Sequence, residues 1–381
     1  MRVLIAHSFY RIGGGEDACV RQQLDLLRPH HEVLLLAKHN AELPGEVTTG
    51  IRMAYSRRIR TEVEGTIRSF HPDVIHVHNV YPAFGPAVFL GARRFDIPLV
   101  MTAHNYRLRC PNGYMFTEDS ICSRCVGGGY HNAVVHPCFP TKEQGVAYAS
   151  SLWLHRFIMK LERDVSVIVS PSEFMRTTLA GLGMDDRRLR MIRNFIQIHA
   201  DADASPGSYG IYVGRLSREK GVHVLLDALS TAGDPPFKIV GDGPQVEQLR
   251  GIASRLGLRH TTFMGRVSSD EVDRLLREAR FVVLPSLWNE NAPLAVLEAM
   301  ARGRPLIVSS VGGLPELADG GAGWTARPGS VHDLSQNIRS VMEDDELCRE
   351  AGAAALAFAR HELTPQRHLT LLEQTYREAI G

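Results

Sequence analysis

Short apolar segments rich in β-branched residues alternate along the chain with longer segments whose apolar positions follow helical spacing. In the first half, five of the short segments predict strands, at Val3–Ala6, Val33–Leu36, Val74–His78, Leu99–Thr102 and Val167–Ser170. The segments between them suit helices, for example Ala18–Leu27 and Glu62–Phe70. Strands that alternate with helices indicate βαβ units and a parallel sheet.

The same alternation restarts after residues 200–207, which have the small, polar, proline-containing composition of a linker. Five further strands are predicted, at Ile211–Gly214, Phe237–Gly241, Thr262–Met264, Phe281–Leu284 and Leu306–Ser309. The pattern therefore predicts an α/β protein with two Rossmann-like domains, residues 1–198 and 208–363, whose parallel sheets face a central cleft. Residues 364–381 predict a helix that either stays on the second domain or packs back on the first.

Composition narrows the class of protein. The chain has 381 residues, of which 44% are hydrophobic and 22% charged, as in ordinary globular proteins of two domains. No apolar run is long enough to span a bilayer, and the first strand lacks the features of a signal peptide, so we expect a cytoplasmic location.

Charge is divided unevenly between the two halves. Residues 1–195 carry 24 Lys and Arg against 18 Asp and Glu, whereas the remainder carries 19 against 24. A basic first half favours an anionic acceptor or an anionic membrane surface, or is a solvated basic face. We expect no nucleic-acid partner.

Ligands of such sheets bind beyond the carboxyl ends of the strands, so the loops that follow the strands are the place to look for chemistry. Gly13, Gly14 and Gly15 follow the first strand and open a helix, where glycine permits close backbone approach and helix amides favour phosphate. The alternative is a plain turn, as it is for Gly241-Asp242-Gly243-Pro244 in the second half.

Charged residues follow two strands of the second half. Arg215 offers a planar fork and Lys220 a compact charge, a pair that suits a pyrophosphate. Glu290 and Glu298 lie eight residues apart, with Pro293 suited to the first turn of a helix that carries Glu298 among apolar residues. A carboxylate there is costly unless paired, and vicinal ribose hydroxyls would pair it. Two carboxylates also suit a glycosidase, but phosphate-binding cations in the same domain argue against one.

With these residues identified, the sequence resembles the retaining GT-B glycosyltransferases of family four. The matching motifs are Gly-Arg-Leu-x-x-x-Lys-Gly at 214–221, Glu-x7-Glu at 290 and 298, Ala-x-Gly-x-Pro at 301–305 and Val-Gly-Gly-Leu-Pro-Glu at 311–316. The resemblance covers nearly the whole chain and is most specific between about 210 and 320.

The resemblance implies a GT-B architecture and a site for a UDP- or GDP-linked sugar. Arg215 and Lys220 would contact the donor diphosphate, Glu298 the ribose and Glu290 the donor sugar. Further contacts would come from Gly214, Gly241, Gly243 and Arg266 and from the backbone near Asn291, Ala292, Pro293 and Leu294. Gly13, Gly14 and Gly15 would approach the diphosphate from the first domain.

His104, at the end of the fourth strand, is similar to a family histidine that lies beside the reaction centre. Family members often place Asp after this histidine, whereas this chain has Asn105, which weakens an acid/base role for the pair. The implied reaction moves a sugar to an acceptor hydroxyl with retention of configuration, and needs neither a catalytic metal nor a protein nucleophile. The acceptor would be a glycan or a lipid-linked molecule.

Other functions fit the same features. One is a nucleotide-sugar epimerase or a phosphorylase of the same fold, and another is a scaffold that binds a sugar nucleotide without turnover. Basic and apolar residues also occur together, as at Trp153, Arg156, Phe157, Ile158 and Lys160, which suits either peripheral docking on an anionic membrane or an ordinary core helix with a charged outer face.

Four of the six cysteines lie in the glycine-rich segment 106–140. The spacing of Cys110, Cys122, Cys125 and Cys138 is Cys-x11-Cys-x2-Cys-x12-Cys, which resembles a tetrathiolate zinc site. A loop this long usually needs a role or a staple, and disulfides fit poorly with a cytoplasmic chain. The alternatives are a structural zinc, in which His131 or His136 could substitute for a thiol, and unligated thiols or a disulfide.

Overall fold

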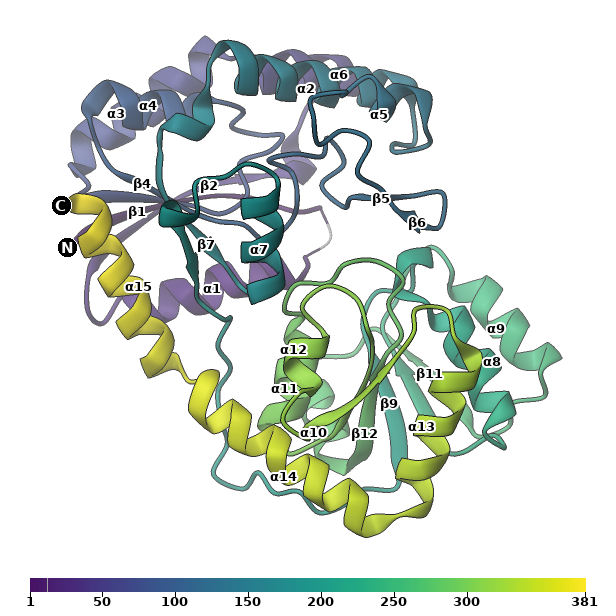
Figure 1. The fold of residues 1–381 in the computed structure, drawn as a ribbon. Coiled ribbons are helices and arrows are strands. Elements are labelled where there is room, and N and C mark those ends of the chain that lie inside the picture. The colour runs from purple at the N-terminus through teal and green to yellow at the C-terminus, as the bar shows by residue number, and fades with distance from the viewer. Residues whose placement is uncertain (12) are drawn as a thin grey trace. The chain divides into compact units, whose positions relative to one another are not determined.

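The computed structural model describes residues 1–11 and 13–381. They form two compact units, the first made of residues 1–192 and 368–381 and the second of residues 193–367 (Figure 1). The boundary therefore differs from the predicted ends at 198 and 208. Residues 200–207 belong to the second unit and do not link the two.

The first unit is built on a six-stranded parallel sheet with the order β2-β1-β3-β4-β7-β8. Its strands are β1 (Arg2–Phe9), β2 (Glu32–His39), β3 (Val74–Val77), β4 (Leu99–Thr102), β7 (Val165–Ser170) and β8 (Leu189–Met191). Its longer helices are α1 (Gly15–Leu27), α2 (Glu46–Ala54), α3 (Arg57–Phe70), α4 (Ala87–Phe95), α6 (Lys142–Trp153), α7 (Glu173–Gly181) and α15 (Pro365–Ile380).

Alternate residues of β1 face opposite sides of this sheet, and both sides are buried. Leu4 and Ala6 belong to the core that α3 and α4 complete, whereas Val3 and Ile5 belong to the core on the other face. Leu369, Leu372 and Tyr376 of α15 pack into that second core together with residues of α1. The C-terminal helix therefore lies on the first unit, which periodicity alone left open.

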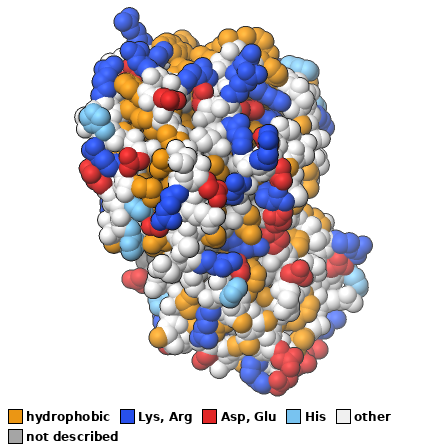
Figure 2. Space-filling model, turned by 60° about the vertical axis from the view of Figure 1, so that its left-hand side comes forward, with side chains coloured by type: hydrophobic (Ala, Val, Ile, Leu, Met, Phe, Trp, Pro, Cys, Tyr) orange, Lys and Arg blue, Asp and Glu red, His pale blue; other side chains and the backbone are white. Residues whose placement is uncertain are grey.

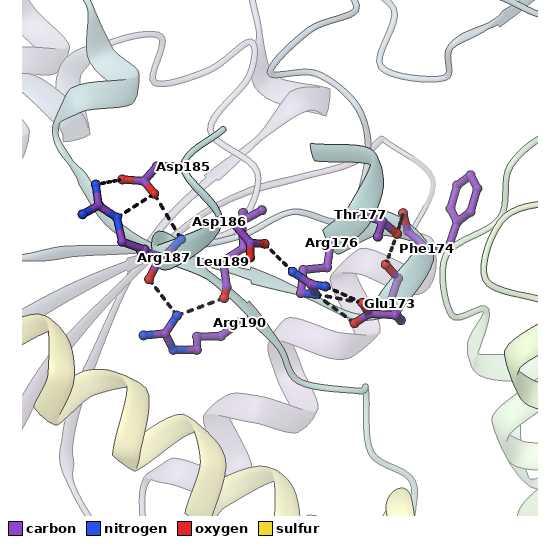
Figure 3. Close-up of polar contacts among 9 residues, drawn as sticks. All are labelled: Glu173, Phe174, Arg176, Thr177, Asp185, Asp186, Arg187, Leu189 and Arg190. Atoms are coloured by element: carbon purple, nitrogen blue, oxygen red, sulfur yellow. Dashed lines mark hydrogen bonds and ion pairs between the residues drawn. The ribbon is translucent and has the colours of Figure 1, made fainter. Parts of the chain in front are cut away.

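Polar contacts hold the turn between α7 and the edge strand β8. The Ser172 hydroxyl caps α7, and Arg176 binds the Glu173 carboxylate through two nitrogens while its other nitrogen reaches Asp186 (Figure 3). Just before β8, Asp185 accepts hydrogen bonds from both the backbone and the side chain of Arg187. Charged residues therefore stabilise an edge that apolar patterning did not predict.

The second unit repeats the architecture with the strand order β11-β10-β9-β12-β13-β14, all parallel. Its strands are β9 (Tyr209–Val213), β10 (Phe237–Val240), β11 (Thr261–Gly265), β12 (Ala279–Leu284), β13 (Leu306–Ser309) and β14 (Gly323–Ala326). Its helices include α8 (Val222–Thr231), α9 (Val246–Arg255), α10 (Ser269–Glu278), α11 (Leu294–Ala301), α13 (Val331–Glu343) and α14 (Asp345–Glu362). One large apolar core fills this unit.

Every strand predicted from the pattern is present, and the prediction of an α/β fold with two parallel-sheet, Rossmann-like halves is confirmed. The strand order reverses between β1 and β3 in the first unit and between β9 and β12 in the second. Ligands of doubly wound sheets bind at such switch points, which directs attention to the loops after these four strands.

Candidate functional site

The loops after β9 and β12 cross at the switch point of the second unit. The Leu287 backbone N–H donates to the Glu219 carbonyl at 2.8 Å. Gly221 has a φ of 70°, and a Cβ on it would lie 2.0 Å from the Pro285 carbonyl oxygen. Only glycine fits at this crossing, so the loop that carries Lys220 is held against the loop that carries Glu290.

Lys220 and Glu290 are joined there by a short ion pair. The Lys220 Nζ lies 2.5 Å from Glu290 Oε1 and 5.3 Å from the ring centroid of Trp288. The same carboxylate oxygen accepts from the Ser286 hydroxyl at 2.7 Å and from Trp288 Nε1 at 3.0 Å. Oε2 accepts no hydrogen bond from the described residues, which leaves one oxygen of a buried, oriented carboxylate for a ligand hydroxyl.

The loop after β13 fixes the backbone of Glu290. The Gly313 N–H donates to the Glu290 carbonyl at 2.7 Å, and a Cβ on Gly312, where φ is 60°, would lie 2.0 Å from the same oxygen. Three loops that are distant in sequence therefore converge on Glu290, two of them through its carboxylate and the third through its backbone carbonyl.

Two arginines at this end of the sheet have guanidinium groups without a partner among the described residues. Arg215 is exposed, and its backbone carbonyl accepts from the Tyr212 hydroxyl at 2.8 Å. Arg266, which directly follows β11, is also exposed. Neither guanidinium makes an ion pair or hydrogen bond with a residue that the structure describes. Both remain available for an anion.

The glycines beside Arg215 are required by packing. A Cβ on Gly241, where φ is 133°, would lie 1.9 Å from the Gly214 carbonyl oxygen, and one on Gly243 would lie 2.3 Å from that of Leu216. A Cβ on Gly214 itself would meet the Tyr212 hydroxyl at 2.8 Å. These glycines hold two loops together, and contact with a nucleotide stays a prediction for them.

Helix α11 carries the second carboxylate. It begins at Leu294, so Pro293 is the residue before the helix and not, as predicted, a residue of its first turn. No side chain caps this end, while Asn291 and Ala292 just before it are buried and the Ala292 carbonyl accepts from Asn194 Nδ2 at 3.2 Å.

Glu298 is half-buried on this helix. Its carboxylate accepts no hydrogen bond from any described residue. Burial raises the pKa of Glu298, and the nearby Asp273 carboxylate raises it further. A carboxylate without a hydrogen-bond partner in such a place costs stability, which makes Glu298 a candidate for binding a ligand.

The switch point of the first unit holds the other predicted residues. Helix α1 begins at Gly15 after Gly14, again without a side-chain cap. A Cβ on Gly14 or Gly15 would meet nothing within 4 Å, and one on Gly13 would meet only Asp17 Oδ2, at 3.7 Å. Among the described residues, nothing in the packing requires these glycines, so their role must be sought in what approaches them.

Glu16, the next residue, connects this loop to the end of β4. Its carboxylate accepts from Asn105 Nδ2 at 2.8 Å and from the Tyr10 hydroxyl at 2.7 Å. Beside Asn105, His104 Nε2 lies 2.8 Å from His78 Nδ1. The structure thus brings His104 and the glycine loop together through Glu16. Sequence reasoning missed this residue, although its place in the first turn after three glycines was a signal.

His104 ends a row of stacked histidines. The ring centroids of His76 and His78 are 4.4 Å apart, and those of His78 and His104 are 5.1 Å apart. Burial lowers the pKa of all three, to about 3 for His76. The rings are therefore neutral at physiological pH, and His104 serves as a hydrogen-bonding group and not as a fixed cation.

The four cysteines line one cavity of the first unit. Within the described residues, no three or more His, Cys, Asp or Glu side chains are arranged as a set of metal ligands. Among the helices of residues 1–11 and 13–381, none has the length and apolar character needed to cross a membrane.

Known proteins resemble the chain over nearly its whole length. The family model "Glycosyl transferase 4-like domain" matches residues 14–194, and "Glycosyl transferases group 1" matches residues 202–357. The chain is 32% identical over 333 residues to the glycogen synthase of Mycobacterium tuberculosis, which covers 84% of this chain and 72% of that protein. It is 27% identical over 334 residues to the D-inositol 3-phosphate glycosyltransferase of Corynebacterium aurimucosum, covering 82% and 74%.

Solved structures agree with the fold. Anabaena HepE in complex with UDP and glucose has a TM-score of 0.72 at 19% identity and covers 99% of both chains. Sucrose-phosphate synthase of Thermosynechococcus elongatus has a TM-score of 0.74 at 16% identity, covering 99% of this chain and 98% of that one. With the two parallel-sheet units and the matched families, these likenesses show that the chain belongs to the GT-B glycosyltransferases of family 4.

Proposed function

We propose that the protein transfers a sugar from a UDP- or GDP-linked donor to an acceptor hydroxyl, with retention of configuration and without a catalytic metal. The observation that carries the proposal is the grouping at the second switch point. There, Lys220 pairs with Glu290, Arg215 is unpaired, and Glu298 accepts no hydrogen bond from the described residues. The solved complexes of HepE with UDP and with UDP-glucose support a nucleotide-sugar donor for a chain of this fold.

Each of these groups has a place in the proposed donor complex. Arg215 and Lys220 bind the diphosphate, Glu298 accepts from the two ribose hydroxyls, and Glu290 accepts from a hydroxyl of the sugar through Oε2. The uncapped amides at the start of α11 add a positive field. Arg266, next to β11, suits the nucleoside end.

In the proposed reaction, the bond between the sugar C1 and the diphosphate oxygen breaks as the acceptor oxygen forms its bond to C1 on the same face. The acceptor proton passes to an oxygen of the leaving diphosphate, so no protein nucleophile takes part. Arg215, Lys220 and the helix amides stabilise the negative charge that develops on the leaving group. This is electrostatic catalysis by groups that are already oriented.

The acceptor side of the proposal rests on a cavity of the first unit that reaches His104. Its walls are mostly apolar, with polar groups from His78, Tyr81, Arg107 and His155. His78 Nε2 is buried there without a hydrogen-bond partner among the described residues. A neutral histidine pair beside apolar walls suits a glycan or lipid-linked acceptor, as in the synthesis of polysaccharides, lipid-linked glycans or glycoconjugates.

A second proposal, peripheral docking on an anionic membrane, rests on exposed apolar side chains. Trp153, Phe157 and Ile158 are 48%, 41% and 60% exposed at the end of α6 and in the turn after it, and Lys160 follows them. Helix α2 packs on α6 where Gly50 meets Ala147, and it adds Ile51, which is 67% exposed. Figure 2 shows apolar and basic side chains together at the top of its view.

The membrane proposal makes a direct prediction. We expect the protein to sediment with phosphatidylglycerol vesicles and not with phosphatidylcholine vesicles, and to lose this binding in the double variant Trp153→Ser/Ile158→Ser. Equal recovery of the double variant and the unchanged protein would contradict it. Together with the expected cytoplasmic location, this proposal would put the enzyme at the inner face of the membrane.

The first test of the donor proposal is thermal unfolding with a panel of nucleoside diphosphates and their sugars, without added metal. A bound ligand raises the unfolding temperature in proportion to the logarithm of its concentration over its Kd. A rise with one base identifies the donor, and no rise with any of them contradicts the proposal.

Product analysis then separates the rival functions. Conversion of donor alone to an isomer indicates an epimerase, and sugar phosphate formed with inorganic phosphate indicates a phosphorylase. Donor binding without any product, across a panel of acceptors, indicates a scaffold.

A further inference from the structure

We propose that the first unit holds a structural zinc ion on the thiolates of Cys110, Cys122, Cys125 and Cys138. The inference does not depend on the proposed transfer reaction. It concerns residues 109–140, which contribute none of the candidate donor or acceptor groups.

Three separate turns present the four cysteines. Cys110 closes a turn in which its N–H donates to the Tyr106 carbonyl, and Cys122 directly follows the short hairpin β5 (Phe116–Thr117) and β6 (Ser120–Ile121). Cys125 lies one turn later, where its carbonyl accepts from the Gly128 N–H at 3.0 Å. Cys138 comes after the short helix α5 (Asn132–Val135). A Cys-x2-Cys turn with two more distant cysteines supplies the four sulfur ligands of a structural zinc site.

The four cysteines share one cavity. Asn112 and His136 also line it. Four thiolates around one cavity supply the number and type of ligands that a structural zinc ion takes.

The ligand set favours sulfur over imidazole. His136 Nδ1 lies 3.3 Å from the Glu118 carboxylate, and Arg124 reaches both that carboxylate, at 3.0 Å, and the Cys122 sulfur, at 3.9 Å. These contacts engage His136 elsewhere and give a thiolate at Cys122 a positive neighbour. Cys110, whose thiol donates to Asn112 Oδ1 at 2.9 Å, would exchange that hydrogen bond for the metal.

The segment 106–140 has little regular structure of its own, namely two strands of two residues and one helical turn. Tyr106 and Met115 anchor it in the core of the first unit, and a small separate cluster packs Cys125, Tyr130 and Ala133 on two residues of α6. All four cysteines are unpaired, so no disulfide closes it. In the described residues the thiols line the cavity walls without yet forming a set of metal ligands. Binding therefore requires their side chains to turn inward, to zinc–sulfur distances of about 2.3 Å.

The test is the metal content of the whole chain, purified under reducing conditions without chelator. We expect one zinc ion per chain by elemental analysis. We also expect the four thiols to react with a thiol reagent only after zinc is removed, and cobalt substitution to give the visible spectrum of a tetrahedral thiolate site. In Cys125→Ser zinc should be lost, whereas Cys348→Ser, at a buried cysteine of the second unit, should retain it.

The measurements on the unchanged chain decide the matter even if Cys125→Ser does not fold. Absence of zinc both as purified and after titration with zinc would overturn the proposal. So would detection of disulfides among these cysteines after alkylation under native conditions, or a cobalt spectrum without thiolate character.

Discussion

The two units share one architecture but hold their candidate chemistry in opposite ways. In the second unit the groups at the switch point are charged, with Lys220 and Glu290 paired at 2.5 Å. In the first unit they are mostly neutral, because burial lowers the pKa of His78 and of His104. Fixed charges suit a diphosphate whose charge grows during reaction, whereas neutral groups suit an uncharged acceptor hydroxyl. The difference matches the proposed division, in which the second unit binds the donor and the first unit the acceptor.

The glycines of the two units also differ, in whether the surrounding atoms leave room for a Cβ. A Cβ on Gly221, Gly241 or Gly312 would overlap backbone atoms of a neighbouring loop, so the fold of the second unit needs these glycines. A Cβ on Gly14 or Gly15 would meet nothing. Packing therefore requires the glycines of the second unit and does not explain those of the first, for which close approach of a ligand stays a prediction.

The largest effect is expected at the charge pair of the second unit. Lys220→Ala removes a cation from the diphosphate and leaves the buried Glu290 carboxylate without its counter-ion, so we expect turnover to fall by about 10²- to 10³-fold. The loss should exceed that of His104→Ala, because the histidine carries no fixed charge. Initial rates of nucleotide release from the donor identified by thermal unfolding measure both.

Arg255→Ala is the matched control, since this exposed residue at the end of α9 lies outside the site. It should keep normal turnover. If Lys220→Ala also kept turnover within about twofold, or if His104→Ala proved the more damaging change, the assignment of fixed charge to the second unit would be wrong.

Glu298→Gln should have a smaller effect, and it should change nucleotide binding and stability in opposite directions. Without its carboxylate, Glu298→Gln should bind the nucleotide about 10- to 100-fold more weakly, as expected for hydrogen bonds to a charged group. The unliganded variant should nevertheless be more stable than the unchanged protein at neutral pH. Calorimetric titration and thermal unfolding measure the two quantities.

The pH dependence follows from the raised pKa of Glu298. The folded chain keeps this proton to higher pH than the unfolded chain does, so the carboxyl lowers stability as the pH rises above its ordinary value of 4.5 and costs nothing well below that value. The stability advantage of Glu298→Gln should therefore grow from pH 4 to pH 7. An advantage that shrinks over that range would contradict the unpaired state of the carboxylate.

Much of the fold could be predicted because buried parallel strands are short apolar runs. The two core-sheet strands that patterning missed, β8 and β14, are the edges of their sheets. They read Leu-Arg-Met and Gly-Trp-Thr-Ala, since an edge strand buries less and so needs fewer apolar residues.

The sequence could predict which residues of the candidate site lie in each loop, but not which of them are in contact. The positions of Lys220, Glu290 and Glu298 came from motifs, but the contact between Lys220 and Glu290 joins residues 70 apart in sequence. The bond between Glu16 and Asn105 joins residues 89 apart. Such contacts depend on the strand order, which a single sequence pattern does not contain.

The hydrogen bond between Asn105 and Glu16 can be tested directly. Asn105→Asp restores the residue that often follows this histidine in the family, but it places a carboxylate where Asn105 Nδ2 now donates to Glu16 at 2.8 Å. We expect the free energy of unfolding to fall by about 1–3 kcal/mol at pH 8. The fall should be smaller at pH 5, where the two carboxylates can share a proton.

Thermal unfolding of three variants isolates the contact. The double variant Glu16→Gln/Asn105→Asp should recover most of the lost stability, and Glu16→Gln alone should be mild. An unchanged unfolding temperature in Asn105→Asp would show that Glu16 does not hold the His104 turn, and the first unit would then lack the organised site that the comparison assigns to it.

The smallest effects are expected from a matched pair of buried tyrosines, one in each unit. The Tyr212 hydroxyl donates to the Arg215 carbonyl at 2.8 Å, and the Tyr376 hydroxyl lies 2.6 Å from His76 Nδ1. Tyr212→Phe and Tyr376→Phe should each cost about 1 kcal/mol in urea unfolding, because each removes one buried hydrogen bond. Only Tyr212→Phe should also weaken nucleotide binding, since it loosens the backbone that carries Arg215. Equal nucleotide affinity in both variants would show that this hydrogen bond does not position Arg215, and a loss in Tyr376→Phe alone would move the donor's anchor to the first unit.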